Sequence, residues 1–183
     1  MHKIVAILIG LILVSNCDAG WHPFKKKYKR SGEENARLLI QKLRDFDPSL
    51  NALINSSVGY AVFPRIANVA IGIGGGGGNG KFFYGENLYG TCKLTQVSFG
   101  LQLGGQIYSE VVLFQDVDTF QIFLSGEFKF GGSVSLAILE EGWGRNIGFK
   151  DGTAVIVKGQ KGLMYEAAIK GQRFHCKPIG KSQ

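Results

Sequence analysis

A glycine run that ends in a lysine is the most chemically suggestive stretch of this chain. Residues 72–83 read GIGGGGGNGKFF, and two phosphate-binding patterns fit them. Gly75, Gly80 and Lys81 have the spacing of a P-loop core, and three of the glycines also match the G-x-G-x-x-G of a dinucleotide loop. Either loop must lead into a helix whose first N–H groups face the phosphates. The identity of this run therefore depends on the residues after Lys81.

Those residues argue against a nucleotide. A P-loop needs Ser or Thr directly after its lysine, and this chain has Phe82 there. The stretch FFYG favours a strand over a helix. No acidic residue in a strand-helix-strand unit supports the dinucleotide alternative. We predict a flexible glycine connection between two strands, with room for another backbone or a ligand to approach closely.

Residues for acid-base or nucleophilic chemistry are scarce. Of three histidines, only His175 lies in the expected folded region. On a strand, His175 and Cys176 point to opposite faces, which argues against a catalytic pair or a shared metal site and favours a structural His175. The nearest carboxylate pairs, Glu140-Glu141 and Asp116 with Asp118, lack histidine partners and calcium-loop spacing and indicate a turn and a helix cap. A hydrolase using Ser98 or Ser109 lacks a visible base. We predict no catalytic residue, no metal site and no cofactor.

The beginning of the chain has the layout of a signal peptide over residues 1–19. Lys3 precedes eleven apolar residues, and small or polar residues come after them. The apolar run is shorter than the roughly 20 residues of a membrane-spanning helix. Two kinds of cleavage fit: ordinary cleavage before Gly20, or the lipoprotein type, in which Cys17 becomes the lipidated first residue. Asn16 departs from the small residue that lipoprotein cleavage prefers. The chain is predicted to be exported.

Two cysteines remain after ordinary cleavage. An exported Cys92 and Cys176 could form a disulfide in an oxidising compartment, or stay two separate half-buried thiols. The sequence leaves both alternatives open.

A basic arm comes after the leader at residues 20–30. The chain has a formal net charge of +7, and the arm supplies five positive charges from Lys25, Lys26, Lys27, Lys29 and Arg30. Such a cluster suggests an anionic partner, although a solvated arm that aids solubility fits equally well. Exposed aromatics interleaved with basic residues, which nucleic acid would require, are missing from the pattern. We therefore predict no nucleic-acid partner.

Two helices should come after the arm. Ser31 and Glu34 have capping-box spacing, and Ala36, Leu39, Ile40 and Leu43 place an apolar stripe on the helix expected over residues 31–46. That stripe must pack on a core or lie on a lipid surface. Asp47-Pro48 then starts a short second helix.

The rest of the chain favours strands. From residue 58 onward, apolar residues alternate with small or polar ones and glycines punctuate the pattern, most clearly in VSFGLQLGG at residues 97–105. One short helix is expected over residues 118–124. Because no comparable helix separates most strands, the predicted fold class is α+β: a glycine-rich, mainly antiparallel β-sheet or barrel-like core with N-terminal helices. The domain is expected over residues 31–178, with a short tail at 179–183.

Four blocks, in this order, closely resemble the SYLF domain family: GYAVFPRIANVAIGIGGGGGNGKFFYG, LTQVSFGLQLGGQIYSEVVLF, GWGRN and KGLMYEA. The resemblance extends over about residues 36–174. Members of the family occur as exported bacterial proteins and as eukaryotic trafficking and cytoskeletal proteins. The family is known for binding phospholipids, notably phosphoinositides, and some eukaryotic members bind actin.

The resemblance implies a lipid-binding site at the N-terminal end of the domain, where eukaryotic members use a basic amphipathic helix. Arg37, Lys42 and Arg44 carry over as candidates, and Lys25, Lys26, Lys27, Lys29 and Arg30 join them on charge alone. The expected function is non-enzymatic docking on anionic phospholipid membranes of the cell envelope, in the periplasm or at the outer membrane of a bacterium, or otherwise as a secreted protein. The alternative is a structural or partner-binding envelope protein. The leader puts cytosolic phosphoinositides and actin in doubt as partners.

Overall fold

The computed structural model describes residues 31–130, 135–139, 147–159 and 171–180. Two helices come first, α1 (Gly32–Phe46) and α2 (Pro48–Asn55). Ser31 caps α1 by accepting a hydrogen bond from the backbone N–H of Glu34 (3.1 Å), and Asp47 caps α2 with Pro48 in its first turn. Both predicted helix starts are confirmed.

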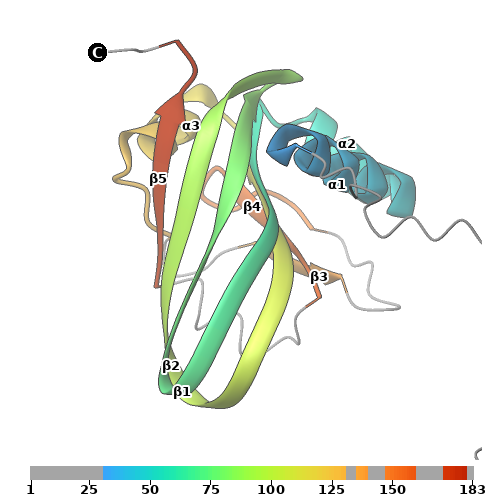
Figure 1. Cartoon of the computed structure of the whole chain (residues 1–183). Helices are drawn as coiled ribbons and strands as arrows, with labels where there is room; N and C mark the ends of the chain where they lie inside the picture. The colour runs from blue at the N-terminus through green and yellow to red at the C-terminus, as the bar shows by residue number, and fades with distance from the viewer. Residues whose placement is uncertain (1–30, 131–134, 140–146, 160–170, 181–183) are drawn as a thin grey trace, which may run out of the picture.

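Two unusually long strands form the body of the molecule. β1 (Gly59–Tyr84) and β2 (Asn87–Phe114) pair antiparallel along almost their whole length. In Figure 1 this ribbon runs down the molecule, turns at the lower end and runs back up. The register shifts between residues 71 and 72, close to that turn, and β-bulges of this kind bend strands.

The glycine run lies inside β1, so the predicted flexible connection between two strands is wrong. Gly75 and Gly77 pair with Val97 and Thr95 of β2. The predicted close backbone approach is confirmed, because the ribbon folds back on itself here. A Cβ on Gly76 would lie 2.6 Å from the carbonyl oxygen of Ala67. The run thus allows two halves of one strand to cross at close range.

Within the described residues, three shorter strands extend the sheet. β4 (Thr153–Lys158) pairs with the last residues of β2, and β5 (Gln172–Pro178) pairs with residues 90–96 of β2, both antiparallel. β3 (Leu136–Leu139) is the exception, since it pairs parallel with β4. The described strands run β1-β2-β4-β3 with β5 on β2 as an open sheet. The α+β class with a mainly antiparallel sheet is confirmed, and the barrel-like alternative is wrong for these strands.

Two hydrophobic cores cover the two faces of the sheet. One holds the apolar stripe of α1 and α2 against alternate residues of β1, β2 and β4. The other is rich in phenylalanine and includes α3 (Val117–Ser125), which Asp116 caps and Gly126 ends. Because both faces are covered at this end, β4 is buried at five of its six positions. The predicted short helix is confirmed.

Several predictions fall on residues outside the described part of the chain. These are the leader, the basic arm, Cys17 and the blocks at residues 142–146 and 161–167. Within the described part, no helix is long and apolar enough to span a bilayer.

Candidate anion-binding face beside α1

A concave basic surface lies beside the N-terminus of α1. We call it the basic groove and define it by five side chains that line it: Arg65, Lys81, Lys93, His175 and Lys177. Its volume is about 560 Å³, and no Asp or Glu is among its lining residues. The groove therefore collects positive charge from segments more than 100 residues apart in the sequence.

Strand register explains why these side chains meet. Lys81 of β1 lies opposite Thr91 of β2, which lies opposite Lys177 of β5. Two residues along, Lys93 lies opposite His175. Because side chains two apart on a strand share a face, both rows project from the same side of the sheet. The row between them points into the opposite core.

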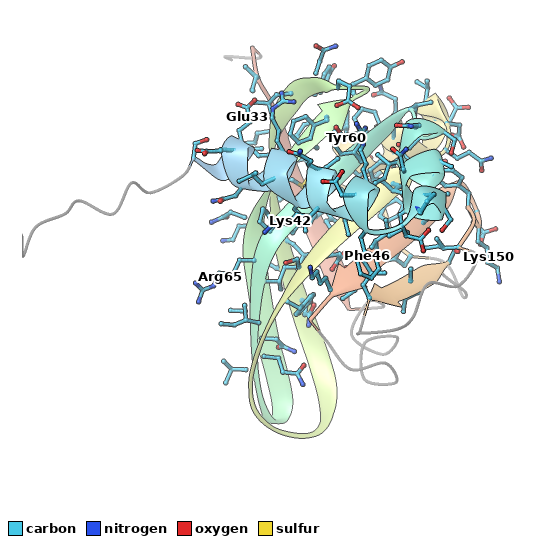
Figure 2. The ribbon with its side chains drawn as sticks, turned by 90° about the vertical axis from the view of Figure 1, so that its right-hand side faces the viewer. Glu33, Lys42, Phe46, Tyr60, Arg65 and Lys150 are labelled. Atoms are coloured by element: carbon cyan, nitrogen blue, oxygen red, sulfur yellow. A yellow bond between two sulfur atoms is a disulfide. The ribbon has the colours of Figure 1, made fainter. Side chains whose placement is uncertain are left out.

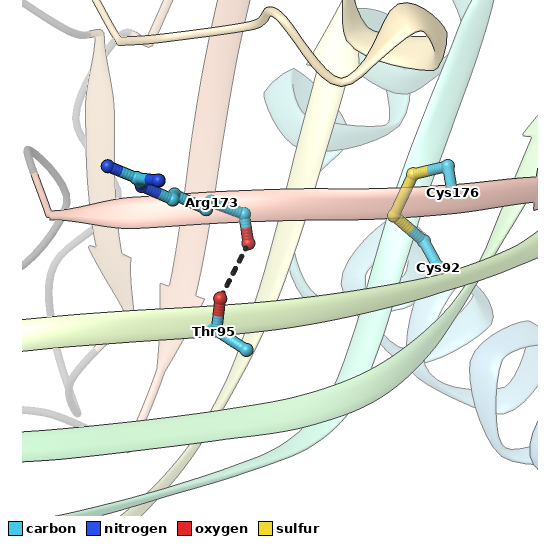
Figure 3. The surroundings of a disulfide bond; sticks show 4 residues. All are labelled: Cys92, Thr95, Arg173 and Cys176. Carbon is cyan, nitrogen blue, oxygen red and sulfur yellow. Dashed lines mark hydrogen bonds between the residues drawn. A yellow bond between two sulfur atoms is a disulfide. The ribbon is translucent and has the colours of Figure 1, made fainter.

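A disulfide in that middle row fixes β5 to β2. Cys92 and Cys176 are directly opposite each other and are bonded (Figure 3). Nearby, the hydroxyl of Thr95 donates a hydrogen bond to the carbonyl of Arg173 (3.5 Å). Of the two alternatives left open by the sequence, the structure has the disulfide. It holds the two β5 side chains of the groove in register with those of β2.

A second groove of about 420 Å³ runs along α1 and shares Arg65 with the first. Lys42 of α1 and Lys158 at the end of β4 also line it, again with no Asp or Glu. Figure 2 shows Lys42 and Arg65 on the same side of α1. Ser109 lies in this groove, and its hydroxyl donates to the carbonyl of Pro64 (2.9 Å). We call Lys42, Arg65 and Lys158 the helix-side cations.

The other two predicted helix residues are engaged within the fold. Arg37 donates to Glu33 (2.9 Å) and to the carbonyl of Glu86 (3.3 Å), and its guanidinium lies 5.0 Å from the ring centre of Phe83. Arg44 pairs with the carboxylate of Glu86 at 2.5 Å. Glu86 belongs to the tight turn between β1 and β2, so both arginines tie α1 to that turn. The structure brings only Lys42, of the three, to a basic groove.

Tyr60 completes this contact between α1 and the turn. Its hydroxyl donates to the second carboxylate oxygen of Glu86 (3.4 Å). Burial, and then the negative charge of Glu86, raise the pKa of Tyr60 to about 12. The phenol therefore stays protonated well above its ordinary range.

The apolar stripe of α1 is buried in the fold. Ala36, Ile40 and Leu43 are at most 4 % exposed, and Leu39 packs against the same core. The sequence left core packing and a lipid surface open for this stripe, and the folded domain uses it as core. An insertion of this face into lipid would expose the sheet beneath it.

Comparisons with known proteins show which family part of the chain resembles. Residues 95–176 match the model of the Ysc84 family, described as "Las17-binding protein actin regulator", which corresponds to the SYLF domain. Over the matched residues the chain is similar to the SYLF family. A curated relative, "Beta cell expansion factor A" of Aeromonas veronii, is 26% identical over 153 residues. That alignment covers 77% of this chain and 57% of the relative, so the chain spans little more than half the relative's length.

The match adds to the case for a binding protein. The family description names a binding protein and regulator. In the described part of the chain, no three His, Cys, Asp or Glu side chains lie close enough to hold a metal ion. His175, for which the sequence favoured a structural role, is exposed and lines the basic groove.

Sequence reasoning missed most of the cations that line the two grooves. Arg65, Lys81, Lys93, Lys158 and Lys177 were not among the predicted site residues. A usable signal was present, because in TCKLTQ and RFHCKP the polar Thr91, Lys93, His175 and Lys177 alternate with less exposed residues. What the sequence lacked was the pairing of β5 with β2, which brings the two basic stretches side by side.

A buried polar cluster was also missed. Gln172 donates to the carboxylate of Glu110 (2.8 Å) and to Gln96 (3.3 Å), and the hydroxyl of Tyr108 donates to Gln96 (2.5 Å). All four residues are at most 5 % exposed. The cluster joins two distant parts of β2 to β5, so it holds the folded ribbon closed.

Proposed function

We propose that this protein binds anionic phospholipid membranes through its basic arm and the cationic face beside α1. The observation that supports this most is the clustering of cations in two grooves whose described lining holds no carboxylate. The arm continues the same charge, because Arg30 is only two residues before Gly32, which lines the basic groove. Both would attract a negatively charged surface.

Long-range attraction is the first part of the mechanism. A basic residue near an anionic membrane contributes about 1 kcal/mol, so the helix-side cations and the arm together are worth several kcal/mol. Ions screen this attraction, since the Debye length is only about 8 Å at physiological salt. Binding should therefore weaken as salt rises.

Retention on the membrane needs an apolar anchor, because one weak attachment binds reversibly. The buried stripe of α1 does not supply it. Trp21, Phe24 or a lipid on Cys17 remain proposals for the leader and arm. On the folded part, Val69 and Ile107 are 62 % and 57 % exposed and occupy diagonal positions on one face of the ribbon. Either source would add apolar contact to electrostatic attraction.

We propose further that the protein is exported and works without catalysis at the cell envelope, in the periplasm or at the outer membrane of a bacterium. The signal-like leader supports export. The hydroxyl of Ser109, one of the two serines considered as a nucleophile, is held by a backbone carbonyl. These observations favour a binding role.

Binding to a protein partner is the second candidate. The description of the matching family, a Las17-binding actin regulator, favours it. The same cationic face would then receive an acidic protein surface. Co-sedimentation with actin filaments, without binding to liposomes under the same conditions, would favour this alternative over the first.

Liposome sedimentation tests the membrane proposal. The full chain is expressed with its leader in a bacterial host that can export it. The purified protein is mixed, over a salt series, with phosphatidylcholine vesicles that contain or lack phosphatidylglycerol. Three variants are compared: the arm variant K25S/K26S/K27S/K29S/R30S, the face variant K42S/K158S and the control K129S/K150S. Lys129 and Lys150 are exposed and line neither groove. The control thus matches the charge removed from the face.

We expect salt-sensitive binding to the anionic vesicles alone. At about 1 kcal/mol for each charge, the face variant should lose roughly 30-fold in affinity. The arm variant should lose more, and the control should keep most of its binding. An absence of binding at low salt would remove the membrane proposal. Equal losses of affinity in the face variant and the control would show that the face beside α1 is no more important for membrane binding than other exposed lysines.

A further inference from the structure

We propose that the basic groove is a discrete binding site for a compact phosphate-bearing anion with more than one negative charge. The membrane proposal requires only a diffuse cationic surface, whereas this inference names a pocket and a ligand class. Where the anion is a lipid headgroup, the inference rests on the proposed membrane binding. The test with a soluble anion is independent of membrane binding.

Concavity is the first argument. The walls of the groove come from the first turn of α1, both arms of β1, and the paired segments of β2 and β5. A volume of about 560 Å³ is in the range of small-molecule sites. A flat membrane phosphate layer would touch only the rim of such a hollow, but a projecting phosphate group could enter it.

Charge is the second argument. Arg65, Lys81, Lys93 and Lys177 place four basic side chains around one hollow. Within the described part of the chain, the ion pairs Arg37–Glu33 and Arg44–Glu86 do not involve any of these four. Four cations in one pocket repel each other, and a single phosphodiester charge offsets only part of that repulsion. A phosphomonoester or a diphosphate matches the site better.

The centre of the groove offers a neutral hydrogen-bond donor. Thr91 is exposed on β2 with Lys81 on one side and Lys177 on the other. Neighbouring strands are about 4.8 Å apart, so the two lysines start on either side of the hydroxyl within reach of one phosphate group. A threonine hydroxyl flanked by two ammonium groups can donate to a phosphate oxygen.

Gly32 helps to place Lys81 at this centre. A Cβ built on Gly32 would lie 3.4 Å from the Cε of Lys81, so the lysine stem passes directly against the first residue of α1. The ammonium group and the positive end of the helix dipole then favour the same anion. Glu33, in the same turn, is paired with Arg37.

Calorimetric titration with inorganic pyrophosphate, at constant ionic strength, tests the pocket without a membrane. The full processed chain is compared with K81Q/K177Q, with T91V and with the control K129Q/K150Q, which removes equal charge elsewhere. We expect the loss of both lysines to weaken binding at least about tenfold, and the loss of the hydroxyl to weaken it severalfold. The control should bind like the unchanged protein. Circular dichroism and thermal unfolding confirm that each variant is folded.

Vesicles identify the source of the phosphate. Phosphatidic acid, a phosphomonoester, and phosphatidylglycerol, a phosphodiester, are compared at matched surface charge. A preference for phosphatidic acid that K81Q/K177Q loses assigns the pocket to a lipid headgroup. Pyrophosphate binding without that preference assigns it to a soluble phosphate compound.

Two results would overturn the inference. One is no measurable pyrophosphate binding by the folded protein, and the other is equal weakening in K81Q/K177Q and K129Q/K150Q, which would mean diffuse attraction only. In either case, salt-sensitive binding to phosphatidylglycerol vesicles can persist. Failure of the pocket is thereby distinguished from failure of the membrane proposal.

Discussion

At the scale of single residues, the glycines of residues 72–80 differ in what they permit. Gly80 is buried, and a Cβ there would lie 2.5 Å from the carbonyl oxygen of Val62 and as close to the ring of Phe63. Gly75 is exposed, and its Cβ would meet nothing nearer than 3.9 Å. Close packing therefore requires a glycine at position 80, whereas the packing around position 75 leaves room for a larger side chain.

Alanine substitutions should separate these two roles. Gly80→Ala forces a methyl group against backbone and an aromatic ring, so we expect a loss of about 1–3 kcal/mol in the free energy of unfolding. Gly75→Ala should be neutral or slightly stabilising, because glycine is a poor strand residue. Urea unfolding of both variants measures the difference. Equal stabilities would contradict the close crossing of the two halves of β1.

At the scale of elements, β5 is joined to β2 by a disulfide as well as by backbone pairing. Cys92 and Cys176 are 84 residues apart in the sequence. In the chain-entropy account, closing a loop of that length stabilises the folded state by about 4 to 5 kcal/mol, although measured values are commonly lower. β5 also supplies His175 and Lys177 to the basic groove. Loss of the disulfide should therefore lower the stability of the fold and also loosen the placement of His175 and Lys177 in the basic groove.

Removing the disulfide tests this coupling. We expect C92S/C176S to lose about 2–4 kcal/mol in the free energy of unfolding and to become insensitive to reducing agent, while the unchanged protein loses a similar amount on reduction. Urea unfolding with and without dithiothreitol gives both values. If reduction left the stability of the unchanged protein intact, β5 would be held by its hydrogen bonds and phenylalanine contacts alone.

At the scale of the whole molecule, each of the two cores contains a buried tyrosine. Tyr60 belongs to the core under α1, and Tyr108 belongs to the phenylalanine-rich core. The pKa of Tyr60 is raised to about 12, and that of Tyr108 is also raised, by burial first and then by the charge of Glu110. In the folded protein these two phenols therefore stay protonated at a pH near 10, where the unfolded chain releases the same protons.

This difference predicts alkaline destabilisation. Above pH 10 the unfolded chain binds fewer protons than the folded chain, so the free energy of unfolding should fall as pH rises from 10 toward 12. Below pH 10 these phenols contribute no pH dependence. Urea unfolding over this range and tyrosinate absorbance measure the effect, and Tyr60→Phe should make the dependence shallower. Ionisation of every tyrosine in the folded protein near pH 10 would contradict it.

Local signals were enough to predict most elements. Ser31 and Asp47 mark helix starts through their own side chains, and Asp116 does the same for α3. Alternation identified the strands, most clearly over residues 97–105 of β2. These features depend on interactions within a few residues, so a sequence displays them directly. The parallel pairing of β3 with β4 has no such local signal.

The sequence alone determined the helix caps, the period-two strands, the family resemblance and the concentration of charge in the arm, because each is carried by neighbouring residues. Only the tertiary structure decided that the glycine run is a crossing strand, that Cys92 meets Cys176 and that Arg37 and Arg44 fasten α1 to a turn. The basic groove, too, could be recognised only in the tertiary structure. Its cations meet because long-range strand register places β5 beside β2, and no short stretch of sequence encodes that register.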